Sequence, residues 1–166
     1  MKRLRSTMIF AVSMIFAASS CKKHIGTQTI PEPVITHSHT LVAEPSAIGR
    51  FNGYYIALPI GYDSTIKKYP LLLFLHGLGQ RGNGQGDLSY LLFDGIGKVL
   101  KDDRLPPQFT VQGENFSLII VSPQYSDQPN ADDVMQFIDT IVTRYRIRTN
   151  RIYLSGLSLG SRIATQ

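Results

Sequence analysis

The chain has 166 residues, of which 43% are hydrophobic and 17% are charged, and its formal net charge is +5. This balance is typical of a globular protein and excludes the weakly hydrophobic, highly charged class of chains that stays disordered. Lys2, Arg3 and Arg5 supply three of the positive charges, so the rest of the chain is close to neutral. Its basic residues are scattered and form no stripe with aromatic side chains, which argues against nucleic-acid binding.

The first residues have the three-part layout of an export signal. The basic start precedes an apolar run over residues 8–18, and small residues follow up to Cys21. The run is too short to cross a bilayer, because a membrane-spanning helix needs about 20 apolar residues. We therefore interpret residues 1–20 as a signal peptide.

The only cysteine of the chain ends the string Ala18-Ser19-Ser20-Cys21, which resembles a bacterial lipobox. In a lipobox the thiol is lipidated and the chain is cut just before the cysteine. The sequence thus predicts an exported lipoprotein, anchored to a bacterial membrane at Cys21 and facing the periplasm or the cell surface. Two alternatives stay open, a plain secretory signal cut near Ala17 to Ser20 and a buried cysteine.

Residues 21–48 contain several prolines and many threonine, serine and histidine residues, with no sustained apolar period. This composition predicts an extended tether. His37 and His39 would share one face of a strand and could bind a metal there. Without a third ligand nearby we interpret them as solvated tether histidines and expect no metal.

From residue 49 to residue 166 the pattern changes to alternating strands and helices, which we interpret as one domain. Arg50–Leu58 is rich in strand-forming aromatic residues. Tyr69–Leu75 is continuously apolar and short, as in a strand buried on both faces of a parallel sheet. Asp87–Lys101 has apolar residues at helical spacing and is predicted to be a helix, although it contains Gly95 and Gly97.

Residues 116–154 continue this alternation. Phe116–Val121 is a predicted strand that Ser122-Pro123 should end. Asn130 is placed to cap a helix with an apolar stripe, and Arg144 suits the end of that helix. Arg151–Leu154 is a fourth predicted strand. Strands that alternate with helices indicate an α/β fold with a parallel sheet and right-handed crossovers.

One short motif carries chemistry. Gly156-Leu157-Ser158-Leu159-Gly160 matches G-x-S-x-G, the nucleophile elbow, and stands between a predicted strand and a predicted helix start. The turn of such an elbow is so tight that side chains at Gly156 and Gly160 would collide with neighbouring backbone. Ser158 is therefore the candidate nucleophile.

A nucleophilic serine also needs donors for the oxyanion that forms when it attacks a carbonyl group. One donor on such an elbow is the N–H of the next residue, Leu159, and the other comes from a loop after an earlier strand. His76-Gly77-Leu78-Gly79 follows Tyr69–Leu75, and its glycines allow the N–H of Leu78 to turn towards the same point. We interpret His76 as a structural residue that orients this loop, and a role as catalytic base as the weaker alternative.

Several strings together resemble a known family from about Phe51 onward. They are Leu58-Pro59-Ile60-Gly61-Tyr62-Asp63, the run from Tyr69 to Gly77, Ser122-Pro123-Gln124, and the run from Asn150 to Gly160. The chain is similar to bacterial esterases of the α/β-hydrolase superfamily, near the feruloyl-esterase and polyhydroxybutyrate-depolymerase-like group and the phospholipase/carboxylesterase group. It departs from many relatives at Ser161, where they carry glycine.

The resemblance implies the α/β-hydrolase fold, a mostly parallel sheet flanked by helices. It implies hydrolysis of small-molecule or polymer-linked carboxylic esters through an acyl-serine intermediate, with no metal and no organic cofactor.

The superfamily order is serine, then an acid, then histidine, whereas residues 159–166 contain no Asp, Glu or His. The four histidines, His24, His37, His39 and His76, all precede Ser158. We therefore expect that the chain holds only the N-terminal half of the domain and is inactive as it stands. A serine peptidase on the same scaffold and a noncatalytic surface lipoprotein are the alternatives.

Overall fold

The computed structural model describes residues 38–45 and 47–165. The predicted signal peptide, Cys21, His24, His37 and most of the predicted tether lie outside the described residues. Among the helices of the described part, none is both long enough and apolar enough to cross a membrane.

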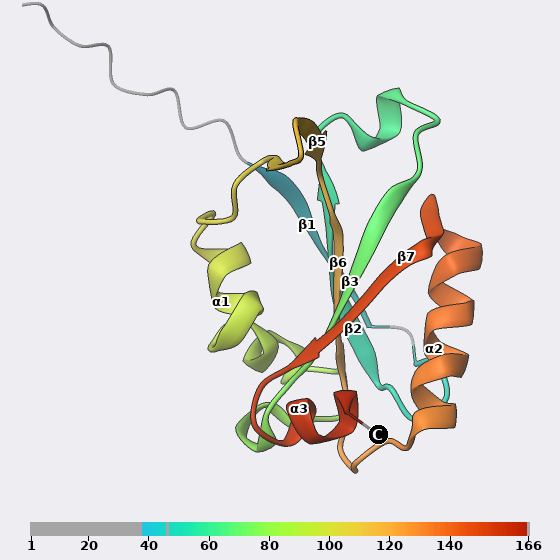
Figure 1. Cartoon of the computed structure of the whole chain (residues 1–166). Coiled ribbons are helices and arrows are strands. Elements are labelled where there is room, and N and C mark those ends of the chain that lie inside the picture. The colour runs from blue at the N-terminus through green and yellow to red at the C-terminus, as the bar shows by residue number, and fades with distance from the viewer. Residues whose placement is uncertain (1–37, 46, 166) are drawn as a thin grey trace, which may run out of the picture. The chain divides into compact units, whose positions relative to one another are not determined.

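A five-stranded sheet forms the centre of the described part (Figure 1). Its strands are β1 (His39–Glu44), β2 (Gly53–Pro59), β3 (Tyr69–Leu75), β6 (Ile119–Gln124) and β7 (Ile147–Gly156), in the spatial order β1-β2-β6-β3-β7. Strands β6, β3 and β7 are parallel, and β2 and β1 continue the sheet in antiparallel pairings. A separate hairpin consists of β4 (Phe109–Val111) and β5 (Glu114–Phe116).

Helices cover both faces of the sheet. α1 (Gly95–Lys101) contributes Leu100 to the apolar cluster on one face. α2 (Ala131–Arg144) and α3 (Leu159–Ala164) contribute to the larger cluster on the other face. Three short 3₁₀ helices lie in the connections, η1 (Tyr62–Ser64), η2 (Leu78–Gln80) and η3 (Leu88–Leu92). The predicted α/β class with flanking helices is confirmed.

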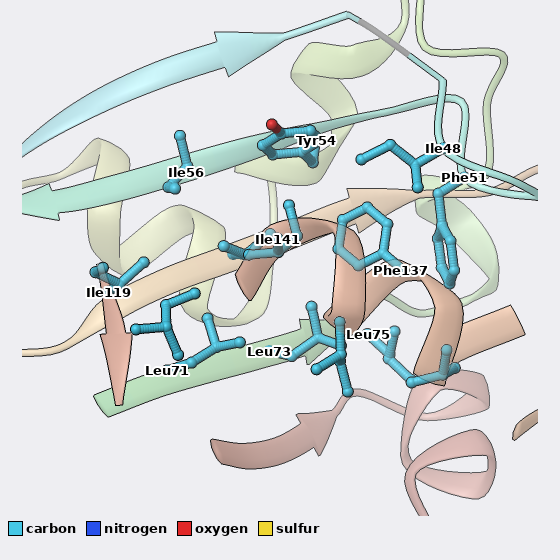
Figure 2. Packing of buried hydrophobic residues seen from close by; sticks show 14 of the residues in the cluster. Ile48, Phe51, Tyr54, Ile56, Leu71, Leu73, Leu75, Ile119, Phe137 and Ile141 are labelled. Carbon is cyan, nitrogen blue, oxygen red and sulfur yellow. The ribbon is translucent and has the colours of Figure 1, made fainter. Parts of the chain in front are cut away.

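The larger core cluster lies between the sheet and α2 (Figure 2). Alternate residues of β3, namely Leu71, Leu73 and Leu75, point into it and are fully buried. From α2, Phe137 packs on Phe51 with ring centroids 4.6 Å apart. The sequence predicted this stripe of α2 and its cap correctly, since the Asn130 side chain accepts a hydrogen bond from the N–H of Asp133.

Two predicted boundaries are wrong for reasons of pairing. The predicted tether does not reach residue 48, because His39–Glu44 pairs along its whole length with β2. Ser122-Pro123 does not end its strand, because β6 runs on to Gln124. β6 pairs with β3 only as far as Val121, so Pro123 lies in a stretch whose ladder is with β2 alone, where a missing N–H is tolerated.

The predicted helix over Asp87–Lys101 is also wrong as one element. The chain forms η3, then turns, and then forms α1. Gly95 has φ 59°, a left-handed conformation that breaks the helix. A side chain at Gly97 would place its Cβ 1.9 Å from the carbonyl oxygen of Leu91, so this glycine lets α1 pack against η3.

Candidate active site

Ser158 lies in the turn between β7 and α3. Its backbone has φ 51° and ψ −110°, which places a non-glycine residue in a sparsely populated region. The residue is exposed at the end of the sheet. The strand–turn–helix setting that the motif predicted is therefore present, and the turn holds the serine in a strained conformation.

The two motif glycines of the elbow make close backbone contacts. A Cβ on Gly156 would lie 2.3 Å from the carbonyl carbon of Gly160, and a Cβ on Gly160 would lie 2.0 Å from the carbonyl oxygen of Leu75. Real Cβ atoms do not come so close to backbone atoms, so only glycine fits either position. The two sides of the elbow are thus in close backbone contact with each other, and Gly160 is in close contact with the end of β3.

The loop after β3 lies directly beside the elbow. Leu75 pairs with Gly156, and the N–H of Leu157 donates to the carbonyl oxygen of Leu75 at 3.0 Å. A Cβ on Gly77 would lie 3.7 Å from the Cβ of Ser158. The structure therefore brings together the two segments in which the sequence placed the oxyanion donors.

The two expected donors, the N–H groups of Leu78 and Leu159, share one property. Leu78 is the first residue of η2 and Leu159 is the first residue of α3. In the part of the chain that the structure describes, neither N–H group donates a hydrogen bond, as is usual for the first turn of a helix. Both N–H groups are therefore available to an acceptor.

Gly79 belongs to the same predicted string but has a different environment. A Cβ there would meet no atom within 4 Å, and the backbone does not have a left-handed φ. The geometry gives no steric reason for glycine at this position, in contrast to Gly156 and Gly160.

His76 is fully buried behind the loop, and both of its ring nitrogens have partners. The N–H of Tyr125 donates to Nε2 at 3.1 Å, so Nδ1 carries the proton and donates to the carbonyl oxygen of Gly77 at 2.7 Å. The ring stacks on the Tyr125 ring at 3.7 Å, and the Tyr125 hydroxyl donates to the carbonyl oxygen of His76 at 2.6 Å. Desolvation by burial lowers the pKa of His76 to about 4, and the nearby Arg81 acts in the same direction.

These contacts make His76 a neutral clamp between β6 and the loop 77–92, which we call the oxyanion loop after its expected role. A base must have a free nitrogen that can reach the serine hydroxyl. His39, the other described histidine, lies at the start of β1, at the opposite end of the sheet. Asp132 and Asp133 lie in the first turn of α2, where their negative charge suits the N-terminal end of the helix.

Sequence reasoning missed two buried glutamines that hold the oxyanion loop. The Oε1 atom of Gln80 accepts from the N–H of Gly77 at 3.3 Å, and its Nε2 donates to the carbonyl oxygens of Tyr90 and Leu91 at 3.1 and 3.2 Å. The loop 77–92 is thereby tied to itself through one side chain.

Gln124 ties the same loop to the sheet from the last position of β6. Its Nε2 donates to the carbonyl oxygens of Gln80 and Asp87 at 3.1 and 3.0 Å, and its Oε1 accepts from the N–H of Gly84 at 2.9 Å. The only signals in the sequence are that Gln80 directly follows the His76–Gly79 string and that Gln124 ends Ser122-Pro123-Gln124. Neither signal identifies a partner.

No metal site is evident in the described ranges, where no three His, Cys, Asp or Glu side chains come together. What the arrangement offers is an exposed serine on a strained turn, next to the loop after β3, with unpaired N–H groups at Leu78 and Leu159. Such a set can bind and stabilise a tetrahedral oxyanion formed on Ser158.

The comparisons with known proteins agree with this fold. No family model and no curated protein matches the chain. A solved structure named as a ferulic acid esterase is 23% identical, with a TM-score of 0.53 over 76% of this chain and 53% of that chain. The chain is also similar to a thermostable esterase, with 20% identity and a TM-score of 0.41 over 74% of this chain and 35% of that chain. It is similar to a ferulic acid esterase from Anaeromyces mucronatus in complex with ferulic acid, with 22% identity and a TM-score of 0.40 over 75% of this chain and 50% of that chain.

The first of these similarities shows the fold. The chain adopts the α/β-hydrolase fold and spans about half the length of the ferulic acid esterase that it resembles.

Proposed function

We propose that the protein is a serine hydrolase that cleaves carboxylic esters through an acyl-serine intermediate. The observation that carries the proposal is that Ser158 lies exposed in a turn with a positive φ, beside the loop that contains Leu78. The similarity in fold to a ferulic acid esterase supports it.

In the proposed reaction, Oγ of Ser158 attacks the carbonyl carbon of the ester and its proton passes to a general base. The carbonyl oxygen becomes an oxyanion that accepts hydrogen bonds from Leu78 and Leu159, and each such donor typically contributes about 3 kcal/mol. The alcohol leaves with the proton, and water then cleaves the acyl-serine in the same way. The substrate is a small-molecule or polymer-linked ester, and the chemistry requires no cofactor.

We assign the nucleophile and the oxyanion donors to described residues. Neither described histidine is positioned as the base, because His76 is fully hydrogen-bonded and His39 lies at the far end of the sheet. In the superfamily that the chain resembles, the acid and the base follow the nucleophile. We place them in residues that follow Gln166 in the complete protein. We also propose export and attachment to a bacterial membrane at Cys21, on the sequence pattern alone.

The proposal is tested by measuring hydrolysis of p-nitrophenyl butyrate and methyl ferulate by the given chain and by the product of the gene read beyond codon 166. The completed enzyme should be active, and Ser158→Ala should reduce its rate by about 10⁴ to 10⁶. Ser64→Ala, at an exposed serine of η1 away from Ser158, is the matched control and should leave activity unchanged.

Three results would contradict the proposal. Activity of Ser158→Ala equal to that of the wild type would show that Ser158 is not the nucleophile. A natural stop after Gln166, together with no labelling of Ser158 by a fluorophosphonate, would favour the noncatalytic surface lipoprotein. An amidase activity that exceeds the esterase activity would favour the peptidase alternative.

A further inference from the structure

The sheet has two functionally different ends, and the direction of its strands defines them. Ser158 follows β7 and Leu78 follows β3, so both lie at what we call the nucleophile end. The pairings of His39 with Pro59 and of Tyr69 with Ile147 place the starts of β1, β3 and β7 at the other end, which we call the anchor end (Figure 1). Ser38, the first described residue, thus lies at the end away from Ser158.

The separation between the two ends is large. β7 has ten residues from Ile147 to Gly156, and a strand rises by about 3.3 Å per residue, so the ends are roughly 30 Å apart. If the protein is attached through its N-terminal segment, as proposed above, that segment connects to the described part at Ser38, at the anchor end.

Exposed aliphatic side chains occur at the anchor end. Ile66 is 95% exposed in the connection between η1 and β3, beside Arg146, and Ile60 is 58% exposed near His39. Val111, at the turn of the β4–β5 hairpin, is 57% exposed. These side chains flank no catalytic group. At the nucleophile end, in contrast, exposed Leu78 and Leu157 adjoin Ser158, where a substrate would cover them.

The charges of the two ends have opposite sign. The basic residues of the anchor end, Lys67, Lys68, Lys101, Arg104, Arg146 and Arg148, outnumber its acidic residues, Asp63, Asp102, Asp103 and Glu114. At the nucleophile end the acidic residues Glu44, Asp87, Asp94, Asp127, Asp132 and Asp133 outnumber the basic residues Arg50, Arg81 and Arg162. Ile66 is followed directly by Lys67 and Lys68, both exposed.

We propose that the anchor end lies against an anionic lipid bilayer, with Ile66 at the level of the headgroups and Lys67 and Lys68 above anionic lipids. An exposed aliphatic side chain flanked by lysines suits this interface, because the aliphatic part leaves water while the ammonium groups stay hydrated near negative charge. The acidic nucleophile end is repelled by the same surface. The proposal takes the direction of attachment from the N-terminal anchoring proposed above and does not depend on esterase activity.

This contact would fix the orientation of the candidate active site relative to the membrane. Ser158 would be held roughly 30 Å from the lipid surface and would face away from it. Such a protein presents its site to substrates outside the membrane and not to the acyl chains of the bilayer.

The test places a fluorophore at each end of the full chain. Because Cys21 is the only cysteine, Cys21→Ser combined with Ser64→Cys or with Gln128→Cys gives one label at the anchor end or at the nucleophile end. The uncut N-terminal apolar run attaches both proteins to vesicles of phosphatidylethanolamine and phosphatidylglycerol that contain nitroxide-headgroup lipids. We expect at least threefold stronger quenching at residue 64 than at residue 128.

The contact between the anchor end and the lipid is tested by substitutions in the protein that is labelled at residue 64. Combining Ile66→Asp with Lys67→Glu and Lys68→Glu should reduce the ratio of quenched to unquenched label about tenfold, since each charge near an anionic surface contributes severalfold. Met135→Asp is the control, because Met135 is 56% exposed on α2, away from the anchor end. Equal quenching at residues 64 and 128, or a triple variant that quenches like the control, would overturn the proposal.

Discussion

Two segments build the candidate site, and different forces hold them. The elbow around Ser158 is fixed by backbone packing, with Gly156 against Gly160 and Gly160 against Leu75. The oxyanion loop after β3 is fixed by buried polar side chains, those of His76, Gln80 and Gln124.

Because the two segments are held differently, different substitutions should destabilise them. Close backbone contacts tolerate no added atom, so one methyl group at a glycine of the elbow should strongly lower the free energy of unfolding. A buried polar network tolerates small shape changes but not the loss of a hydrogen-bond partner, and it responds to pH where one member titrates. The following predictions test this contrast through the free energy of unfolding, from the largest expected effect to the smallest.

Gly160→Ala should destabilise the chain by about 4 kcal/mol or prevent folding, because the new Cβ would lie 2.0 Å from the carbonyl oxygen of Leu75. Urea denaturation measures the effect. Gly86→Ala is the control, since a Cβ there meets no atom within 4 Å, and it should change stability by less than about 1 kcal/mol. Equal midpoints for the two variants would show that the elbow relaxes and is not held by backbone contact.

The stability contributed by neutral His76 should fall by roughly 3 kcal/mol as the pH drops from about 6.5 to about 4. Burial lowers the pKa of His76 to about 4 in the folded chain, so in this pH window the unfolded chain binds the extra proton. The contribution is complete above the unfolded pKa and is lost as the pH falls towards the folded one.

The comparison that isolates this titration is the pH dependence of unfolding for the wild type and for His76→Phe. The variant should be less stable at pH 7 and should show a flatter profile between pH 6.5 and pH 4. Parallel profiles would mean that His76 is charged or exposed in the folded chain.

Gln80→Leu should cost about 2 kcal/mol, because it leaves the N–H of Gly77 and the carbonyl oxygens of Tyr90 and Leu91 without their partner. Hydrogen exchange of the Gly77 amide should speed up in proportion. Gln85→Leu, at an exposed glutamine of the same loop, should have little effect on either measurement. Unchanged exchange at Gly77 in Gln80→Leu would show that the network does not hold the loop.

Ser161→Ala should have the smallest effect, about 0.5 kcal/mol. The Ser161 hydroxyl donates to the carbonyl oxygen of Ser158 at 2.6 Å, but the residue is exposed and water replaces the lost donor. Thermal unfolding should detect a shift of a few degrees at most. A loss as large as that of Gln80→Leu would mean that a polar side chain holds the elbow too, and the contrast between the two segments would fail.

Much of the fold could be predicted because the signals are local. Tyr69–Leu75 and the helix capped by Asn130 have the predicted bounds or nearly so, since a continuous apolar run and a capped amphipathic stripe each involve one short segment. The break between η3 and α1 was missed, because the apolar spacing of Asp87–Lys101 fits a helix and the left-handed turn at Gly95 goes with the packing of Gly97 on Leu91. Strand β1 was missed because its side chains are half-exposed and its partner β2 decides its structure.

For the site, the sequence by itself determined the elbow, because the G-x-S-x-G pattern encodes a steric requirement within five residues. It also indicated the neighbouring loop, through glycines that follow a buried strand. Export and lipidation at Cys21, and the roles of Ser158, Leu159 and Leu78 in a reaction, remain predictions.

Only the tertiary structure decided what holds the oxyanion loop in place. Gln124 and Gln80 are 44 positions apart, and His76 and Tyr125 are 49 apart, so no local pattern relates the members of either pair. A buried polar side chain is stable only where the fold supplies its partners. Those partners here are backbone groups, which every residue carries alike, and the sequence cannot show which of them will meet a given side chain.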